Sequence, residues 1–137
     1  MTEHKIVLMI DEDHDFSGII ETKLESKGFD VRAAYAPEAG MQMIKELHPA
    51  LVLLDINLPG MNGIDFLATL KKDDELKDIK VAFFSSLVNP WTNFIDVREA
   101  SKELGAVSFI DKAIDLDSLV EQVGALIAHP KPETDGI

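Results

Sequence analysis

The chain has 137 residues, 46% of them hydrophobic, which suits one folded domain and excludes a disordered acidic tail. Its 25 Asp and Glu against 13 Lys and Arg give a net charge of −12, so we expect no direct binding to nucleic acid or to an anionic membrane surface. The chain has no cysteine, which excludes disulfides and thiolate chemistry and agrees with a cytoplasmic protein, and no apolar run approaches the ~20 residues of a membrane span.

Short apolar runs alternate along the chain with amphipathic stretches. In chain order we expect strand 5–10, helix 15–27, strand 29–34, helix 37–47, strand 50–54, helix 63–72, strand 79–84, helix 93–104, strand 106–110 and helix 115–128. Most of the runs are apolar at consecutive positions, which is typical of strands buried on both faces of a parallel sheet. The run 29–34 is less apolar and fits an edge strand.

Five strands alternating with five helices predict an α/β fold, with helices on both faces of the sheet. Ligands of such sheets bind beyond the carboxyl ends of the strands. We expect one domain over residues 1–128 and a flexible C-terminal tail over residues 129–137, which holds two prolines and a glycine. Whether an effector domain followed this tail in the natural protein is left open.

Polar side chains follow four of the predicted strands. They are Asp11, Glu12 and Asp13 after the first strand, Asp55 after the third, Ser85 and Ser86 after the fourth, and Asp111 and Lys112 after the fifth. Carboxylates gathered at one rim repel one another, and a hard divalent cation removes that cost. Mg²⁺ prefers oxygen ligands, commonly one or two carboxylates with waters and a phosphate. The rim therefore predicts a Mg²⁺ site together with a phosphoryl group.

Asp55 is the candidate nucleophile of this rim, because a carboxylate so placed can form an aspartyl phosphate. The other groups then have to position the phosphoryl group and neutralise the charge on its oxygens. Lys112 supplies a positive charge from another strand, and Ser85 supplies a hydroxyl donor.

Four stretches of the chain resemble the receiver domain of two-component response regulators. They are IVLMIDED, LVLLDINLPGMNGIDFL, VAFFSS and GAVSFIDKA, within a resemblance that runs from Lys5 to Ala128. The resemblance implies a flavodoxin-like (βα)5 three-layer sandwich whose five-stranded parallel sheet has the order 2-1-3-4-5. It also implies a signalling module that catalyses only its own phosphorylation and dephosphorylation. We expect a monomer or weak dimer. The expected partners are a sensor histidine kinase or phosphotransfer protein, which carries the phosphohistidine donor, and a downstream effector protein.

The resemblance also assigns roles to residues. It implies that Asp55 is the phosphoacceptor, that Asp11, Glu12, Asp55 and the backbone carbonyl of Asn57 bind Mg²⁺, that Lys112 contacts the phosphate, and that Ser85 and Phe109 are the switch hydroxyl and switch aromatic. We expect the Phe109 ring to lie inward or half inward, because an outward ring would expose apolar surface.

Three features depart from the family pattern. Glu12 stands where the second acid is usually Asp, so its longer side chain has to be accommodated, and Asp13 could share its role. Ala113 stands where proline usually follows the lysine, and a cis bond without proline would cost ~2.5–4 kcal/mol, so we expect a trans bond. The segment from Ser85 to Lys112 is longer than usual and contains the only tryptophan, Trp91.

Three other functions compete with this one. The main rival is a pseudo-receiver, which binds partners without being phosphorylated, and Glu12 and Ala113 favour it. A Mg²⁺-dependent phosphohydrolase of the haloacid dehalogenase type would need an acid where Asn57 stands. A flavodoxin-like cofactor carrier would need a phosphate-binding first loop, and the acidic stretch IDEDHD would repel phosphate.

Overall fold

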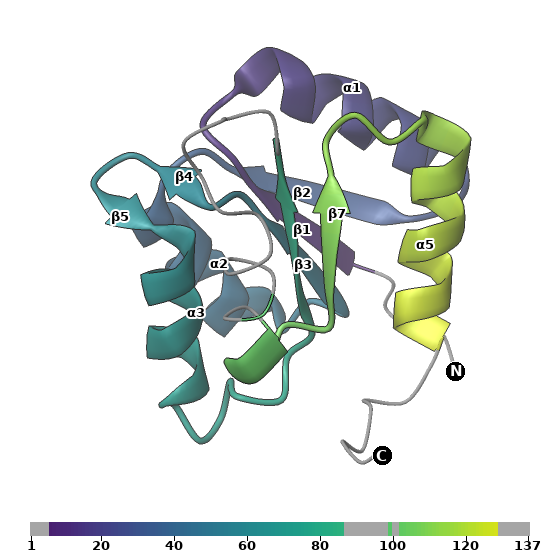
Figure 1. Cartoon of the computed structure of the whole chain (residues 1–137). Coiled ribbons are helices and arrows are strands. Elements are labelled where there is room, and N and C mark those ends of the chain that lie inside the picture. The colour runs from purple at the N-terminus through teal and green to yellow at the C-terminus, as the bar shows by residue number, and fades with distance from the viewer. Residues whose placement is uncertain (1–5, 87–98, 100–101, 129–137) are drawn as a thin grey trace.

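The computed structural model describes residues 6–86, 99 and 102–128 (Figure 1). The elements are β1 (Ile6–Ile10), α1 (His14–Glu25), β2 (Asp30–Ala34), α2 (Pro37–Leu47), β3 (Leu51–Leu54), β4 (Asn57–Leu58), β5 (Met61–Asn62), α3 (Gly63–Lys71), β6 (Val81–Ser85), β7 (Ser108–Asp111) and α5 (Leu116–Ala128). Every predicted element that lies in the described residues is present, with ends shifted by at most two residues. The predicted helix 93–104, the loop around Trp91 and the tail 129–137 fall outside the described residues, apart from a few residues of the helix.

The five longer strands form one parallel sheet in the order β2-β1-β3-β6-β7. This is the predicted order 2-1-3-4-5, since β6 and β7 are the fourth and fifth of the long strands. β2 lies at an edge, as its weaker apolar pattern indicated. The α/β class and the flavodoxin-like arrangement are therefore confirmed.

Each long strand sends alternate side chains to opposite faces of the sheet, and both faces are buried. In β1, Val7 and Met9 join one apolar cluster, whereas Leu8 and Ile10 join the other. The first cluster includes buried residues of α1 and α5, and the second includes buried residues of α2 and α3. The sheet is thus the middle layer of three, with α1 and α5 on one side and α2 and α3 on the other (Figure 1). This arrangement explains the consecutive apolar positions in the sequence.

A two-stranded antiparallel sheet, β4-β5, lies directly after β3 and was not predicted. Asn57 pairs with Asn62 and Leu58 with Met61, and Gly60 turns the chain with φ +75°. Strands of two residues are too short to show a periodic pattern in the sequence. The hairpin brings Asn62 to the start of α3, where its side chain accepts a hydrogen bond from the Ile64 N–H at 2.7 Å.

The end of α5 is tied to the start of β6. The Lys80 ammonium donates to the Leu126 carbonyl at 2.6 Å, in the last turn of α5. That turn has no basic residue of its own, so Lys80 supplies the positive charge that a helix C-terminus favours.

None of the helices in the described part of the chain has the length and apolar character needed to cross a bilayer.

Candidate functional site

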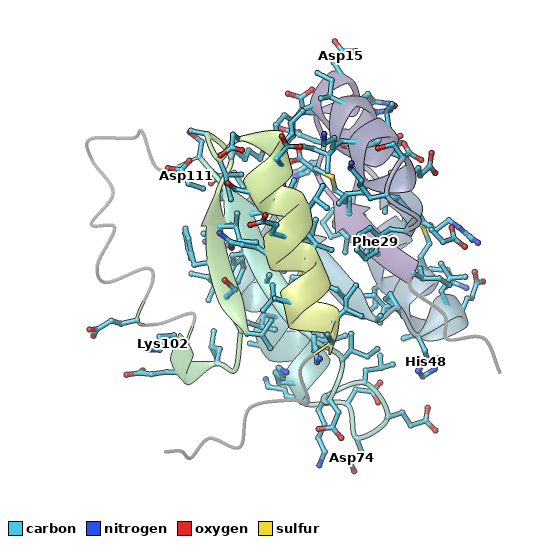
Figure 2. The ribbon with its side chains drawn as sticks, turned by 90° about the vertical axis from the view of Figure 1, so that its right-hand side faces the viewer. Asp15, Phe29, His48, Asp74, Lys102 and Asp111 are labelled. Atoms are coloured by element: carbon cyan, nitrogen blue, oxygen red, sulfur yellow. The ribbon has the colours of Figure 1, made fainter. Side chains whose placement is uncertain are left out.

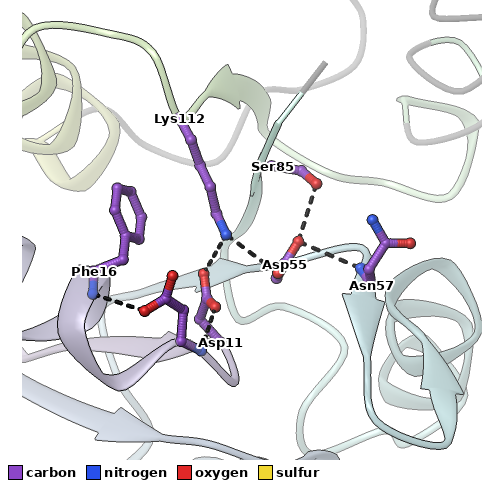
Figure 3. Close-up of polar contacts among 7 residues, drawn as sticks. Asp11, Phe16, Asp55, Asn57, Ser85 and Lys112 are labelled. Atoms are coloured by element: carbon purple, nitrogen blue, oxygen red, sulfur yellow. Dashed lines mark hydrogen bonds and ion pairs between the residues drawn. The ribbon is translucent and has the colours of Figure 1, made fainter. Parts of the chain in front are cut away.

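The carboxyl ends of four parallel strands meet at one rim of the sheet. Figure 2 shows this rim at its upper end, near Asp15 and Asp111, with Asp74 and His48 at the opposite end. Residues that follow neighbouring strands are neighbours here, because Ile10 is in register with Leu54. Four of the predicted site residues come together at this rim in Figure 3, namely Asp11, Asp55, Ser85 and Lys112.

Asp55 is 7% exposed, and its carboxylate lies at the centre of the group. Its Oδ1 accepts hydrogen bonds from the Ser85 hydroxyl at 3.0 Å and from the Asn57 N–H at 3.3 Å. Its Oδ2 lies 3.3 Å from Lys112 Nζ. A buried charge is tolerated only where it is paired and hydrogen-bonded, and the three donors meet that requirement.

Asp11 is 1% exposed and shares the same lysine. Its Oδ1 accepts from the Asp13 N–H at 2.9 Å, and its Oδ2 lies 2.6 Å from Lys112 Nζ. Burial is the largest influence on the pKa of Lys112 and lowers it, but the hydrogen bonds and charges of Asp11 and Asp55 together outweigh burial. The pKa of Lys112 is therefore raised, and the ammonium bridges two buried carboxylates.

The turn at Lys112 is stabilised by a hydrogen bond from the backbone to a side chain. The Asp111 carboxylate accepts from the Ala113 N–H at 2.9 Å, and the Lys112 N–H donates to the Ser85 carbonyl at 3.1 Å. No peptide bond among the described residues is cis, so the expected trans bond before Ala113 is confirmed. The Ala113 N–H that makes this turn is a group that proline would lack.

The other two acids after β1 lie apart from the central group. Asp13 is the N-cap of α1, and its Oδ1 accepts from the Phe16 N–H at 3.0 Å. Glu12 is exposed, and its carboxylate makes no hydrogen bond or ion pair with another described residue. The metal role of Glu12 stays a prediction, and Asp13 is already engaged in capping.

Gly63 packs directly against the backbone of Asp55. This contact was not predicted from the sequence. A Cβ on Gly63 would clash with the Asp55 carbonyl and would come within 2.8 Å of Ile56 Cα. The Gly63 N–H donates to the Ile56 carbonyl at 2.6 Å. The start of α3 therefore fixes the backbone of the central carboxylate, at a distance that only glycine permits.

Phe109 lies inward, at 8% exposed, with its ring centroid 6.1 Å from that of Phe83. This agrees with the expected inward position, while its switching role stays a prediction. Two further aromatic contacts near the rim were not predicted. The Phe16 ring lies 4.9 Å from Lys112 Nζ, and the rings of His14 and Tyr35 stack at 3.6 Å.

The rim offers the oxygen donors that a hard cation prefers. The described residues hold no set of three Asp, Glu or His side chains gathered for a metal, so a Mg²⁺ ion would depend on two carboxylates, with carbonyl and water oxygens completing its ligands. Asp11 Oδ2 is buried, and its close contact among the described residues is the ion pair with Lys112. It lies 2.6 Å from the Lys112 ammonium, so a cation would bind this oxygen by displacing that ion pair. Asp11 and Asp55 therefore fit the predicted metal.

Comparison with known proteins connects this rim to one family. The family model described as the response regulator receiver domain matches residues 7–124. The transcriptional regulatory protein PrrA of Mycobacterium leprae is 31% identical over 88% of this chain and 49% of its own length. The DNA-binding response regulator MtrA of Mycolicibacterium smegmatis is 29% identical over 96% of this chain and 54% of its own length. The chain thus spans about half the length of the curated relatives it matches.

Solved structures agree on the fold. The receiver domain of the Francisella response regulator 1452 has a TM-score of 0.77 at 23% identity, covering 90% of this chain and 96% of that one. The chemotaxis protein CheY4 of Vibrio cholerae has a TM-score of 0.79 at 16% identity, covering 90% of this chain and 99% of that one. The family model covers most of the chain, and the sheet order and rim described above are those its motifs predict. The chain belongs to the response regulator receiver domain family.

Proposed function

We propose that this receiver domain accepts a phosphoryl group on Asp55 from a phosphohistidine donor, in a Mg²⁺-dependent reaction. The observation that carries the proposal is the placement of the Asp55 carboxylate between the Ser85 hydroxyl, at 3.0 Å, and the Lys112 ammonium, at 3.3 Å. A nearly buried carboxylate flanked by a neutral donor and a cation suits a group that will carry a charged phosphoryl.

In the proposed step, an Asp55 oxygen attacks the phosphorus atom of the donor. The new P–O bond forms as the P–N bond to the donor imidazole breaks, and the imidazole takes up a proton from solvent. The Lys112 ammonium, the Ser85 hydroxyl and the Asn57 N–H then stabilise charge on the phosphoryl oxygens. Mg²⁺, held by Asp11, Asp55 and the Asn57 carbonyl, with Glu12 as a further candidate, would supply additional positive charge at those oxygens.

We infer that the signal leaves the site through Ser85 and Phe109. The Ser85 hydroxyl is bonded to Asp55, and a phosphoryl group on Asp55 offers it a new acceptor. Phe109 lies on β7, which pairs with β6, the strand that carries Ser85. A shift of Ser85 toward the phosphoryl group would change the space next to β7 and so the conformations open to Phe109.

The proposed partners are a sensor histidine kinase or phosphotransfer protein as donor, and an effector protein as recipient of the signal. MtrA is named as a DNA-binding regulator, and this chain matches about half of it. The net charge of −12 disfavours phosphate contacts, so we assign any output on DNA to an effector rather than to residues 1–128. We also propose a cytoplasmic location and a monomer or weak dimer, with residues 129–137 as a flexible tail.

The second candidate is a pseudo-receiver that binds partners without phosphorylation. Two observations favour it, namely the exposed position of Glu12 and the ion pair of 2.6 Å between Lys112 and Asp11, which a metal would have to displace. In a pseudo-receiver, the ion pairs of Lys112 would have a structural role only.

Incubation with acetyl phosphate and Mg²⁺, followed by intact-mass measurement, separates the two candidates. We expect a mass gain of one phosphoryl group in the natural protein and none in Asp55→Asn. Asp65→Asn is the matched control, because Asp65 is an exposed acid in the first turn of α3. No gain, with Mg²⁺ binding undetectable, would support the pseudo-receiver, and an unchanged gain in Asp55→Asn would overturn the assignment of Asp55.

A further inference from the structure

The Lys112 ammonium has a third neighbour besides the two carboxylates. Its Nζ lies 2.6 Å from Asp11 Oδ2, 3.3 Å from Asp55 Oδ2 and 4.9 Å from the centroid of the Phe16 ring. In Figure 3 the ring and the Asp55 carboxylate lie on either side of the Lys112 side chain. An ammonium within about 6 Å of an aromatic centroid is attracted by the negative face of the ring.

The ring is held in place by contacts of its own. Phe16 lies in the first turn of α1, and its N–H donates to the capping Asp13 carboxylate at 3.0 Å. Its ring packs against that of Phe84, with centroids 5.5 Å apart and planes at 43°. Phe84 is 1% exposed and belongs to the same apolar cluster that Phe16 packs against, so the ring is anchored from the sheet side.

The ring contact differs from the carboxylate contacts in one respect that matters for the reaction. Binding of a cation and a phosphoryl group gives Asp11 and Asp55 new partners, and the ammonium then has to exchange carboxylate oxygens for phosphoryl oxygens. A ring face is neutral and does not bind the metal, so its attraction for the ammonium persists through that exchange. The turn at Ala113 fixes only the backbone of Lys112, which leaves a long side chain to be aimed.

We propose that Phe16 is a positioning residue, whose ring holds the Lys112 ammonium over the rim while its carboxylate partners change. The effect on phosphorylation rests on the function proposed above, whereas the ring contact itself does not. Loss of the ring face should slow phosphorylation about three- to tenfold, the range expected for one cation–π contact at a partly buried site.

The test compares three variants. Phe16→Leu keeps an apolar contact with Phe84 but removes the ring face, and Phe16→Tyr keeps the ring face. Phe29→Leu is the matched control, because Phe29 is a partly buried ring packed against the same cluster, without a described contact to Lys112. We expect Phe16→Leu to be phosphorylated by acetyl phosphate and Mg²⁺ about three- to tenfold more slowly, and the other two variants to keep the natural rate.

A second readout does not require phosphorylation. In lysine-labelled protein, the ring current of Phe16 should shift the ε-methylene protons of Lys112 upfield, in a signal assigned by its loss in Lys112→Met. The shift should vanish in Phe16→Leu and persist in Phe16→Tyr and Phe29→Leu. An unchanged signal and an unchanged rate in Phe16→Leu would overturn the proposal. If the natural protein is not phosphorylated at all, the proposed function fails, and the lysine signal alone decides whether Phe16 positions Lys112.

Discussion

The two oxygens of the Asp55 carboxylate are divided between neutral and charged donors. Oδ1 takes the Ser85 hydroxyl and the Asn57 N–H, and Oδ2 faces Lys112. Removal of one partner from a buried polar group costs more than the bond itself contributes, because the remaining partner stays desolvated. Substitution of a single side chain in this group should therefore have a large effect on phosphorylation or stability, and that effect can be assigned to the lost contact.

Ser85→Ala should slow phosphorylation by acetyl phosphate about tenfold, since a hydrogen bond to a charged oxygen is worth about 1.5 kcal/mol or more. Ser118→Ala is the control, because its hydroxyl donates to the Asp115 carboxylate at 2.8 Å, in an exposed pair at the start of α5. Rates are measured by intact mass over time. Equal rates in Ser85→Ala and the natural protein would show that the hydroxyl does not act on the phosphoryl group.

The raised pKa of Lys112 makes a prediction about alkaline stability. Because the folded state holds this proton more tightly than the unfolded state, the contribution of Lys112 is complete below the ordinary lysine pKa of 10.5 and is lost as pH rises through the higher folded value. Denaturant unfolding at pH values from 9 to above 11 should show a steeper loss of stability in the natural protein than in Lys112→Met. Lys77→Met, at an exposed position, should match the natural slope. Equal slopes in all three proteins would count against the ion pairs.

The convergence of side chains at the rim could be predicted from the sequence, whereas their individual partners could not. Asp11, Asp55, Ser85 and Lys112 meet because parallel strands end at one edge, which follows from element order alone. The capping role of Asp13 depends on α1 beginning at His14, one residue earlier than expected. The contact of the Phe16 ring with Lys112 depends on how α1 packs against the sheet, so it left no signal in the sequence.

Helices and strands with a periodic pattern could be predicted from the sequence. Features that depend on a single contact could not. The long strands and helices were found to within two residues, because burial on both sheet faces and helical spacing are visible in the sequence. The β4-β5 hairpin was missed, since two-residue strands carry no period. Gly63 was expected only to open a helix, and the close approach to Asp55 depends on tertiary packing.

Two glycines in helices should respond in opposite ways to the same substitution. Gly63→Ala should lower the free energy of unfolding by about 2 kcal/mol or more, because the added Cβ meets the backbone of Asp55 and Ile56. Gly18→Ala should raise it by about 0.5–1 kcal/mol, because nothing lies within 4 Å of the new Cβ in α1. Denaturant unfolding measures both. A neutral Gly63→Ala would contradict the tight packing behind Asp55.

The described part of this acidic chain has apolar layers on both faces of the sheet and the candidate site at one end of the sheet. The −12 charge and the alternation of strands and helices together indicated an α/β protein that does not bind nucleic acid directly, and the fold part of that prediction is confirmed. The family assignment followed from motifs that lie at the strand ends, where the structure also brings the site residues together.

Metal binding should act on the stability of the whole domain. A ligand that binds only the folded state raises Tm by mass action, so millimolar Mg²⁺ should raise the Tm of the natural protein. The rise should be largely lost in Asp11→Asn, which removes one carboxylate from the rim, and kept in Asp65→Asn. Thermal unfolding with and without Mg²⁺ measures the difference. An equal rise in all three proteins would place the metal elsewhere.

Asp55 is the proposed site of phosphorylation, and the chemistry of an aspartyl phosphate allows a direct test. Borohydride reduces an aspartyl phosphate to homoserine, so reduction after treatment with acetyl phosphate and Mg²⁺ marks the acceptor permanently, and peptide mass spectrometry then locates it. We expect homoserine at position 55 and at no other position. Homoserine at position 11 or 13, or at no position in protein shown to bind Mg²⁺, would overturn the assignment of Asp55 as the phosphoacceptor.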